Sequence, residues 1–230
     1  GYAELLKNHE CDRELQEQAL DYILEEGKRL NSITRKMIKL SRIQPGLLNI
    51  ERQDVKKMLE TSLMAVRMKA GQKQIHFTSD IPEGIFCYGD REFLITMMEN
   101  VLDNAIKASH EGGVIEVRAA GEGGALAYIQ VTDHGIGIPA DILDKIDQPF
   151  FKGDKAHSQG GDGFGMGLAI CKSVMLHHHG SLKYESVVGA YTTVTMRFPA
   201  ADYLRLESPE QTDQVKKDSL WVYEASNIIR

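Results

Sequence analysis

The sequence predicts an α+β protein, with a helical part at the N-terminus followed by a mixed sheet that is covered by helices on one face. Residues 14–43 contain no proline and a single glycine, which indicates one long helix. Strand-like and helix-like segments alternate from residue 46 onward, and two strand-like segments at 181–186 and 191–198 end the alternation as a hairpin. Strands mixed with helices in this way are typical of a layered α+β domain.

Composition and charge narrow the possible classes of protein. The 230 residues, 42% hydrophobic and 26% charged, have ordinary globular usage and suffice for one or two domains. A net charge of −6 without a basic cluster argues against nucleic-acid binding. No apolar run reaches the roughly 18 residues of a membrane-spanning helix, so we expect no direct membrane contact. The three cysteines are far apart, which disfavours a disulfide framework and fits free thiols in a reducing cytoplasm.

The first 45 residues are predicted to form two antiparallel helices, the first of them truncated. Apolar residues of the second helix recur at a heptad-like spacing, and they are Ile23, Leu30, Ile33, Met37 and Leu40. A two-helix hairpin cannot bury such a stripe alone, so we expect a homodimer through this hairpin. The alternative is an amphipathic helix that lies on the rest of the chain.

Pro45 interrupts the helix and sets the predicted domain boundary. We divide the chain into a helical hairpin at 1–45, a second domain at 46–199 and a tail of unknown role at 200–230. In the second domain the patterns predict strands at 47–52, 74–79, 84–88, 114–119 and 127–133, with a glycine-rich turn at 121–124. They predict helices at 54–68, 90–109, 140–144 and 167–178, and a polar, glycine-rich loop at 148–162.

Asp133 ends a predicted strand and begins a turn of the form DxGxG, followed by Ile138. A carboxylate here can accept a hydrogen bond from the exocyclic amine of a base, and Gly135 and Gly137 let the backbone approach a flat ligand closely. The motif alone is weak, because many ordinary turns share it.

A second glycine segment leads from Gly163 through Gly165 and Gly167 into a helix, and includes Met166 and Leu168. Alternating glycines before a helix aim successive N–H groups at phosphate oxygens, and the helix dipole adds attraction. The GxGxG spacing differs from the Walker loop and from the dinucleotide fingerprint. A flexible linker is the alternative, which the direct continuation into an apolar helix disfavours.

Asn100 and Asn104 share one face of the predicted helix 90–109, and Lys107 lies near that face. Asparagine is a poor helix former, so two on one face suggest ligand contact. An amide oxygen suits Mg²⁺ that also keeps water and phosphate oxygens. A solvated polar face is the alternative.

Phe150 and Phe151 begin the polar loop and can anchor it, and Lys152 can reach phosphate, although core packing is the alternative for the aromatic pair. The run of three histidines at 177–179 points around a helix rather than to one side, which is poor geometry for a metal. We therefore assign this run a structural or incidental role.

These pieces, in this order, resemble the ATP-binding domain of sensor histidine kinases, which belongs to a wider group with gyrase-type and heat-shock chaperone ATPases. That family has an Asn-rich helix segment, a DxGxG turn, a Phe segment, a lid and a GxGxGL segment, and the chain supplies all five, with the lid at about 153–162. Residues 179–180 and 189–193 are similar to the family's last hairpin, and residues 1–6 and 30–43 to its dimerisation hairpin. The resemblance implies a Bergerat-type α/β sandwich.

The resemblance also implies that the ligand is Mg·ATP. It assigns adenine to Asp133, Mg²⁺ to Asn104, and the phosphates to Lys107 and Lys152. Asn100 and Lys107 are assigned to the transfer step. The implied nucleotide-binding residues are Asn100, Asn104, Lys107, Asp133, Gly135, Gly137, Ile138, Phe150, Phe151, Lys152, Gly163, Gly165, Met166, Gly167 and Leu168.

The implied activity is transfer of the γ-phosphoryl of ATP to a histidine of the hairpin, for relay to the receiver domain of a response regulator. In the family that histidine lies in a His-Glu-x-Arg/Lys-Thr-Pro setting before the Gly-Tyr pair, and none of the eight histidines has this setting. We therefore expect a cytoplasmic piece of a membrane-anchored protein that begins just past its phosphorylation site.

Three positions depart from the family pattern. Ala108 replaces a frequent aromatic beside adenine, and His134 replaces a frequent asparagine in the DxGxG turn. Asn100 stands where the ATPase relatives have a glutamate that activates water, which favours a kinase over an ATPase. A Ser/Thr kinase of the same group, an ATPase, and a nucleotide-binding module without transfer activity remain as alternatives.

Overall fold

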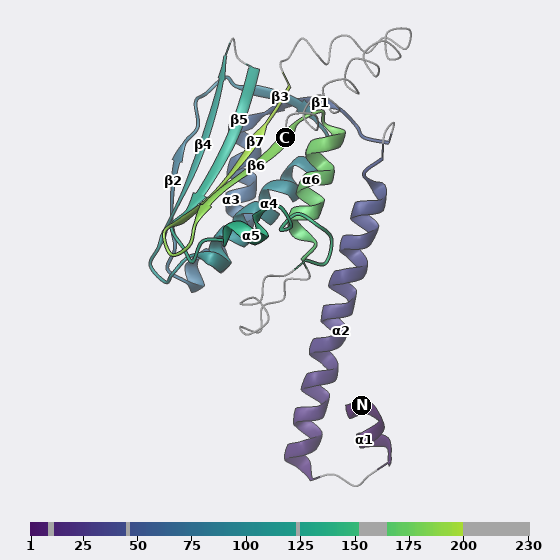
Figure 1. The fold of residues 1–230 in the computed structure, drawn as a ribbon. Coiled ribbons are helices and arrows are strands. Elements are labelled where there is room, and N and C mark those ends of the chain that lie inside the picture. The colour runs from purple at the N-terminus through teal and green to yellow at the C-terminus, as the bar shows by residue number, and fades with distance from the viewer. Residues whose placement is uncertain (9–11, 45–46, 123–124, 152–164, 200–230) are drawn as a thin grey trace.

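The computed structural model describes residues 1–8, 12–44, 47–122, 125–151 and 165–199. The expected lid at 153–162 and the tail at 200–230 lie outside these residues. Figure 1 shows a layered body, in which helices cover one face of a sheet, and one long helix that projects from it.

The projecting helix is α2 (Arg13–Arg42), and Asp12 caps its start by accepting a hydrogen bond of 2.8 Å from a backbone N–H of the first turn. Helix α1 (Tyr2–Asn8) lies beside the start of α2, where the Tyr2 and Tyr22 rings are 4.8 Å apart. The predicted helical N-terminal region is therefore confirmed.

Most of the apolar stripe on α2 is exposed. Leu30 is 62% exposed and Met37 is 49% exposed, whereas Leu40 and Ile43, at the end of the helix, pack against the core. The alternative of a helix lying on the rest of the chain is therefore wrong for most of its length. No helix in the described residues combines the length and the apolar content needed to cross a membrane.

Within the described residues, seven strands form one mixed sheet. The order is β1-β3-β5-β4-β2, with β7 beside β5 and β6 outside β7. The strands are β1 (Glu51–Asp54), β2 (His76–Asp80), β3 (Phe86–Gly89), β4 (Val114–Glu122), β5 (Ala125–Asp133), β6 (Ser181–Val187) and β7 (Tyr191–Arg197). Strand pairs β2–β4 and β3–β5 are parallel, and the other pairs are antiparallel.

Three helices cover one face of this sheet, as predicted (Figure 1). They are α3 (Val55–Gln72), α4 (Arg91–Ala108) and α6 (Gly167–His177), and the single turn α5 (Ala140–Leu143) follows β5. The core lies between the helices and the sheet, and its largest fully buried side chains include Met58, Leu94, Met97, Leu102, Ile115, Ile129, Ile170 and Met196. Burial of these apolar side chains provides the main stabilisation of the fold.

Several predicted boundaries differ from the structure, and α3, for example, continues to Gln72 rather than ending at 68. The first strand is not the apolar run 47–52 but the polar segment β1, because this edge strand pairs only with β3 and buries little except Gln53, which donates a hydrogen bond to the Gly89 carbonyl at 3.3 Å. The turn predicted at 121–124 is shortened, because β4 continues to Glu122 and β5 already begins at Ala125.

Candidate functional site

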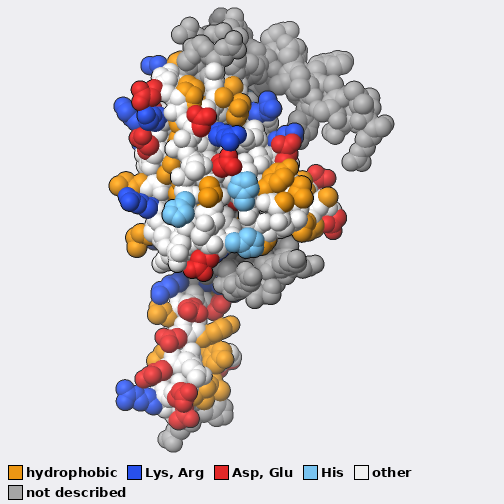
Figure 2. Space-filling model, turned by 90° about the vertical axis from the view of Figure 1, so that its left-hand side faces the viewer, with side chains coloured by type: hydrophobic (Ala, Val, Ile, Leu, Met, Phe, Trp, Pro, Cys, Tyr) orange, Lys and Arg blue, Asp and Glu red, His pale blue; other side chains and the backbone are white. Residues whose placement is uncertain are grey.

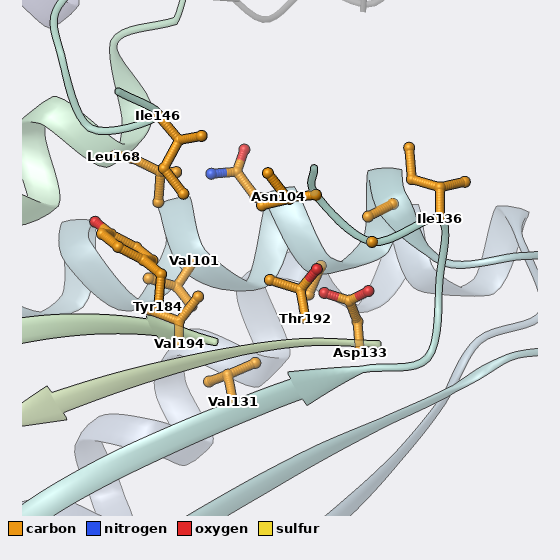
Figure 3. Close-up of a pocket in the computed structure, with 14 residues that line it drawn as sticks. Val101, Asn104, Val131, Asp133, Ile136, Ile146, Leu168, Tyr184, Thr192 and Val194 are labelled. Atoms are coloured by element: carbon orange, nitrogen blue, oxygen red, sulfur yellow. The ribbon is translucent and has the colours of Figure 1, made fainter. Parts of the chain in front are cut away.

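A pocket lies between helix α4, the end of β5 and the β6–β7 hairpin (Figure 3). Asn104, Asp133 and Thr192 contribute polar groups to it from three different elements. Most of the remaining wall is apolar and includes Val101, Ala105, Val131, Ile138, Leu168 and Val194. An apolar slot with a few convergent polar groups is typical of a small-molecule site.

Asp133 is the last residue of β5, and it is only 4% exposed. Its Oδ1 accepts a hydrogen bond from the Gly135 N–H at 3.1 Å. Burial raises the pKa of Asp133 to about 6, and the Gly135 N–H and the charge of His134 oppose this rise only partly. A buried carboxylate of this kind favours a ligand that donates a hydrogen bond to it, because the donor replaces lost hydration.

The turn after Asp133 is fixed against the β6–β7 hairpin. The Ile136 carbonyl accepts a hydrogen bond from the Gly189 N–H at 2.8 Å. Gly137 has φ of +65°, and a Cβ at this position would lie 2.2 Å from the Val187 carbonyl oxygen. Any other residue would displace backbone on one side of the pocket, so the turn requires glycine here.

Ser186 orients the hydroxyl of Thr192. The Ser186 hydroxyl donates its single hydrogen to the Tyr191 carbonyl at 2.7 Å, and it accepts a hydrogen bond from the Ile138 N–H at 2.8 Å. Its 3.0 Å contact with Thr192 Oγ1 must therefore use the Thr192 hydrogen, because a hydroxyl has one donor and two acceptor positions. The lone pairs of Thr192 Oγ1 are left to accept hydrogen bonds in the pocket.

Of the two predicted asparagines, Asn104 lines the pocket and Asn100 does not. Asn100 donates from Nδ2 to the Thr96 carbonyl at 2.9 Å. Its Oδ1 lies beside the start of α6, where a Cβ on Gly167 would be 3.2 Å away. The structure therefore offers the amide of Asn104, rather than that of Asn100, to a ligand in the pocket.

Lys107 lies outside the pocket and is held by Asp103. Its ammonium is 2.6 Å from Asp103 Oδ2, and the Lys69 ammonium is 2.5 Å from Oδ1. Burial alone would raise the pKa of Asp103, but the hydrogen bonds from these two lysines hold it below its usual value. A phosphate would therefore compete with Asp103 for the Lys107 ammonium.

The glycine segment and the Phe segment are joined in the structure. The Phe150 N–H donates to the Gly165 carbonyl at 3.0 Å, while the Phe150 side chain is 58% exposed and that of Phe151 is partly buried. Met166 is buried immediately before α6 and Leu168 lines the pocket. Lys152 and Gly163 lie outside the described residues.

The histidine run has a structural role at its centre. His178 is buried, donates from Nδ1 to the Val174 carbonyl at 2.7 Å, and accepts at Nε2 from the Asp90 N–H at 2.9 Å. Burial lowers the pKa of His178, so its neutral form is favoured and Nδ1 is the protonated nitrogen. His134, in the DxGxG turn, bonds instead to Glu116 on β4 and does not line the pocket.

Sequence patterns do not single out Ser186, Thr192 or Tyr184 as parts of the site. Thr192 reaches the pocket because β7 pairs with β5 in a register that places it opposite Asp133. The Tyr184 ring also lines the pocket, and its hydroxyl is buried without a hydrogen-bond partner among the described residues. The position of Thr192 within the family-like stretch 189–193 is the one signal that could have drawn attention to it.

Two family models match the chain. Residues 1–46 match the His Kinase A (phospho-acceptor) domain. Residues 89–202 match the family described as Histidine kinase-, DNA gyrase B-, and HSP90-like ATPase. The second match spans all the strands and helices that line the pocket.

The sensor-like histidine kinase SenX3 of Mycobacterium tuberculosis is 33% identical over 213 residues, which cover 91% of this chain and 52% of SenX3. The chain therefore spans about half the length of the curated relatives it matches. Among solved structures, the Acinetobacter baumannii histidine kinase AdeS matches with a TM-score of 0.66 at 20% identity, over 87% of this chain and 92% of that chain.

Histidine kinase ThkA, solved in complex with the response regulator protein TrrA, matches with a TM-score of 0.66 at 21% identity, over 86% of this chain and 55% of that chain. At such identities the likeness of the two structures establishes the fold alone. The two family matches, and the identity to SenX3 along nearly the whole chain, show that the chain belongs to the two-component sensor histidine kinases.

Proposed function

We propose that the pocket binds Mg·ATP and that the protein transfers the γ-phosphoryl to a histidine, for relay to a response regulator. The observation that carries this proposal is the buried carboxylate of Asp133, which lies opposite the acceptor oxygen of Thr192 in an apolar slot. The free oxygen of Asp133 suits the exocyclic amine of adenine. Guanine presents a carbonyl oxygen at the same ring position. The Asp133 carboxylate and the Thr192 oxygen would then both face another hydrogen-bond acceptor, so the pocket favours ATP over GTP.

Asn104 is suited to the phosphate side of the nucleotide. Its amide oxygen is a hard, neutral donor in the pocket wall, and Mg²⁺ binds such an oxygen while keeping water and phosphate ligands. A magnesium ion held there supplies charge neutralisation for the β- and γ-phosphates. Lys107, one turn further along α4, would contact phosphate after leaving Asp103.

The residues favour transfer to histidine over hydrolysis. Transfer breaks the bond between the γ-phosphorus and the oxygen that bridges to the β-phosphate, forms a bond from phosphorus to an imidazole nitrogen, and releases ADP. A neutral imidazole has an available lone pair, whereas attacking water needs a base. Asn100 cannot serve as that base, because an amide does not take up a proton and its Nδ2 is bonded to the Thr96 carbonyl.

The projecting helix α2 is the proposed dimer interface. Figure 2 shows apolar side chains along one side of this helix and charged side chains along the other. Within the apolar stripe of α2, Leu30 is 62% exposed and Met37 is 49% exposed. A second copy of the hairpin would bury this stripe. The proposed partner in signalling is the receiver domain of a response regulator, and the structure of ThkA in complex with the response regulator protein TrrA supports this choice. The longer protein is proposed to be anchored in a membrane with these residues on the cytoplasmic side.

The test uses a form of the protein extended N-terminally until it includes a histidine in the phosphoacceptor setting. It is incubated with γ-labelled Mg·ATP, and the labelled protein is treated with acid and with base. We expect label that is lost in acid and survives base, as phosphohistidine does. Acid-stable, base-labile label would instead identify a Ser/Thr kinase, and free phosphate without labelled protein an ATPase. Nucleotide binding without either product would leave a binding module.

A further inference from the structure

Lys73, the residue that follows helix α3, holds the C-terminal end of α4. Its ammonium donates to three backbone carbonyls, those of Ile106 at 3.0 Å, Lys107 at 2.9 Å and Ser109 at 2.9 Å. We propose that Lys73 is a positioning residue for nucleotide binding, which fixes the end of α4 and through it the Asp133 turn. This inference rests on the proposed function of the pocket.

The three acceptors are carbonyls that a helix end leaves without intrahelical partners. An ammonium has three hydrogens, so one Lys73 side chain can satisfy all three, and its positive charge also lies at the favourable end of the helix dipole. Hydrogen bonds from a charged donor are stronger than neutral ones. An ordinary surface lysine is solvated, whereas the partly buried Lys73 has all three of its donors directed at backbone.

The end of α4 is joined directly to the Asp133 turn. The Ala108 carbonyl accepts a hydrogen bond from the Ile136 N–H at 3.0 Å, and Ala108 itself lines the pocket. A Cβ on Gly135 would lie 2.0 Å from the same carbonyl oxygen, so the turn packs against it without space. Gly135 supplies the N–H that bonds to Asp133. A shift of the end of α4 therefore moves the group that orients the carboxylate.

Lys73 is itself fixed at its backbone. Its N–H donates to the Ala70 carbonyl at 3.1 Å, and its carbonyl accepts from the Gly112 N–H at 2.9 Å. Lys73 thus connects the end of α3, the loop between α4 and β4, and the end of α4. It lies outside both ranges matched by the family models, 1–46 and 89–202.

The test compares Lys73→Met with the matched control Lys56→Met. Lys56 is on α3 and its ion pair is with the exposed Glu83, away from α4. Binding of ADP without magnesium and of Mg·ATP is titrated at a temperature where each variant is folded, and amide hydrogen exchange of Ile136 is followed. We expect Lys73→Met to raise both dissociation constants by a similar factor, about tenfold, because the defect is at the base end. Ile136 should lose protection, and Lys56→Met should match wild type in both readouts.

Lys73→Met could instead melt at a lower temperature while binding both nucleotides like wild type, with Ile136 still protected from exchange. This outcome would show that Lys73 has a purely structural role, and it would overturn the inference. If Lys73→Met does not fold, Lys73→Arg carries the test, because a planar guanidinium cannot direct one nitrogen at three carbonyls. It should bind both nucleotides roughly threefold more weakly, and wild-type binding would again contradict the inference. Failure of the wild-type protein to bind nucleotide would instead remove the proposed function.

Discussion

The two ends of the pocket differ in how their polar groups are held. At the base end, Asp133 is bonded to the Gly135 N–H and Thr192 is oriented by Ser186, so the groups already face the cavity. At the phosphate end, Lys107 is engaged by Asp103. The proposed base end is therefore preformed, whereas Lys107, which is proposed to contact the phosphates, would exchange Asp103 for a phosphate when a nucleotide binds.

This difference divides the work of recognition. Preformed groups bind without an ordering cost, so the base end should determine which nucleotide binds and most of its affinity. A group that changes partners contributes to the binding free energy only the difference between its new contact and its old one. The phosphate end should therefore set the placement of the phosphates more than the affinity.

The largest expected effect is at Asp133. In Asp133→Asn, the exocyclic amine of adenine would face either an amide N–H or a neutral carbonyl oxygen instead of a carboxylate. The change therefore removes a charge-assisted hydrogen bond worth about 1.5–3 kcal/mol. We expect a roughly 10- to 150-fold rise in the dissociation constant for every adenine nucleotide, measured by calorimetric titration.

The matched control for this change is Asp144→Asn, which neutralises an exposed carboxylate near the pocket but outside it. Asp144→Asn should bind like wild type. Equal affinities of wild type and Asp133→Asn would show that adenine is recognised elsewhere.

The second effect concerns Asn104 and separates the two ends. Asn104→Ala removes the amide oxygen assigned to magnesium, so Mg·ATP binding should weaken about tenfold, the scale of one lost hydrogen-bonding ligand. ADP binding in the presence of a chelator should change less than about twofold. A loss of equal size for both ligands would place Asn104 at the base end instead.

The third effect is a pH dependence that belongs to the base end. Because the pKa of Asp133 is raised to about 6, its ionised, accepting form is depleted below that pH. ADP affinity should fall about tenfold between pH 7 and pH 5, and the fall should be absent in Asp133→Asn. A pH-independent affinity over this range would contradict the assignment.

The same pKa shift fixes the sign of a stability effect. Asp133 binds its proton more tightly when folded than when unfolded, so it contributes stability that is present below the unfolded pKa and is lost as pH rises through about 6. Without nucleotide, thermal denaturation should show wild type losing stability relative to Asp133→Asn between pH 4 and pH 7.

The smallest effect is at Asp103, and it has the opposite sign. Asp103→Asn weakens the hold on Lys107 and removes a negative charge near the phosphates. Mg·ATP should bind roughly two- to threefold more tightly, in keeping with the small worth of partly exposed ion pairs. Adenosine binding should stay unchanged, and a tighter adenosine complex would show that Asp103 acts on the base end.

The sequence predicts those site residues that can be recognised from their own type and from the residues next to them in the chain. Asp133 and Asn104 carry recognisable residue types at recognisable spacings, and both reach the pocket. The helices with strong apolar periods are also placed well, since α4 spans Arg91–Ala108 where a helix over 90–109 is predicted. These features depend on neighbours within about one helical turn or one loop, which a single sequence displays.

Groups that depend on pairing between distant segments are missed. Thr192 enters the site through the β5–β7 register, and β1 is a strand because β3 pairs with it, although its own residues are polar. Lys73 finds its three carbonyls only once α3 and α4 are packed side by side. Asn100 lies on the predicted helix face and Lys107 near it, but neither lines the pocket; Asn100 is bonded to the Thr96 carbonyl and Lys107 to Asp103.

The most direct test is an experimental structure of the chain with magnesium and a non-hydrolysable ATP analogue. We expect the adenine amine within about 3 Å of an Asp133 oxygen, the Asp133 turn and Thr192 unmoved, and Lys107 separated from Asp103. Adenine bound away from Asp133, or a base end rebuilt around the ligand while Lys107 keeps its ion pair, would contradict the division between a preformed base end and an adaptable phosphate end.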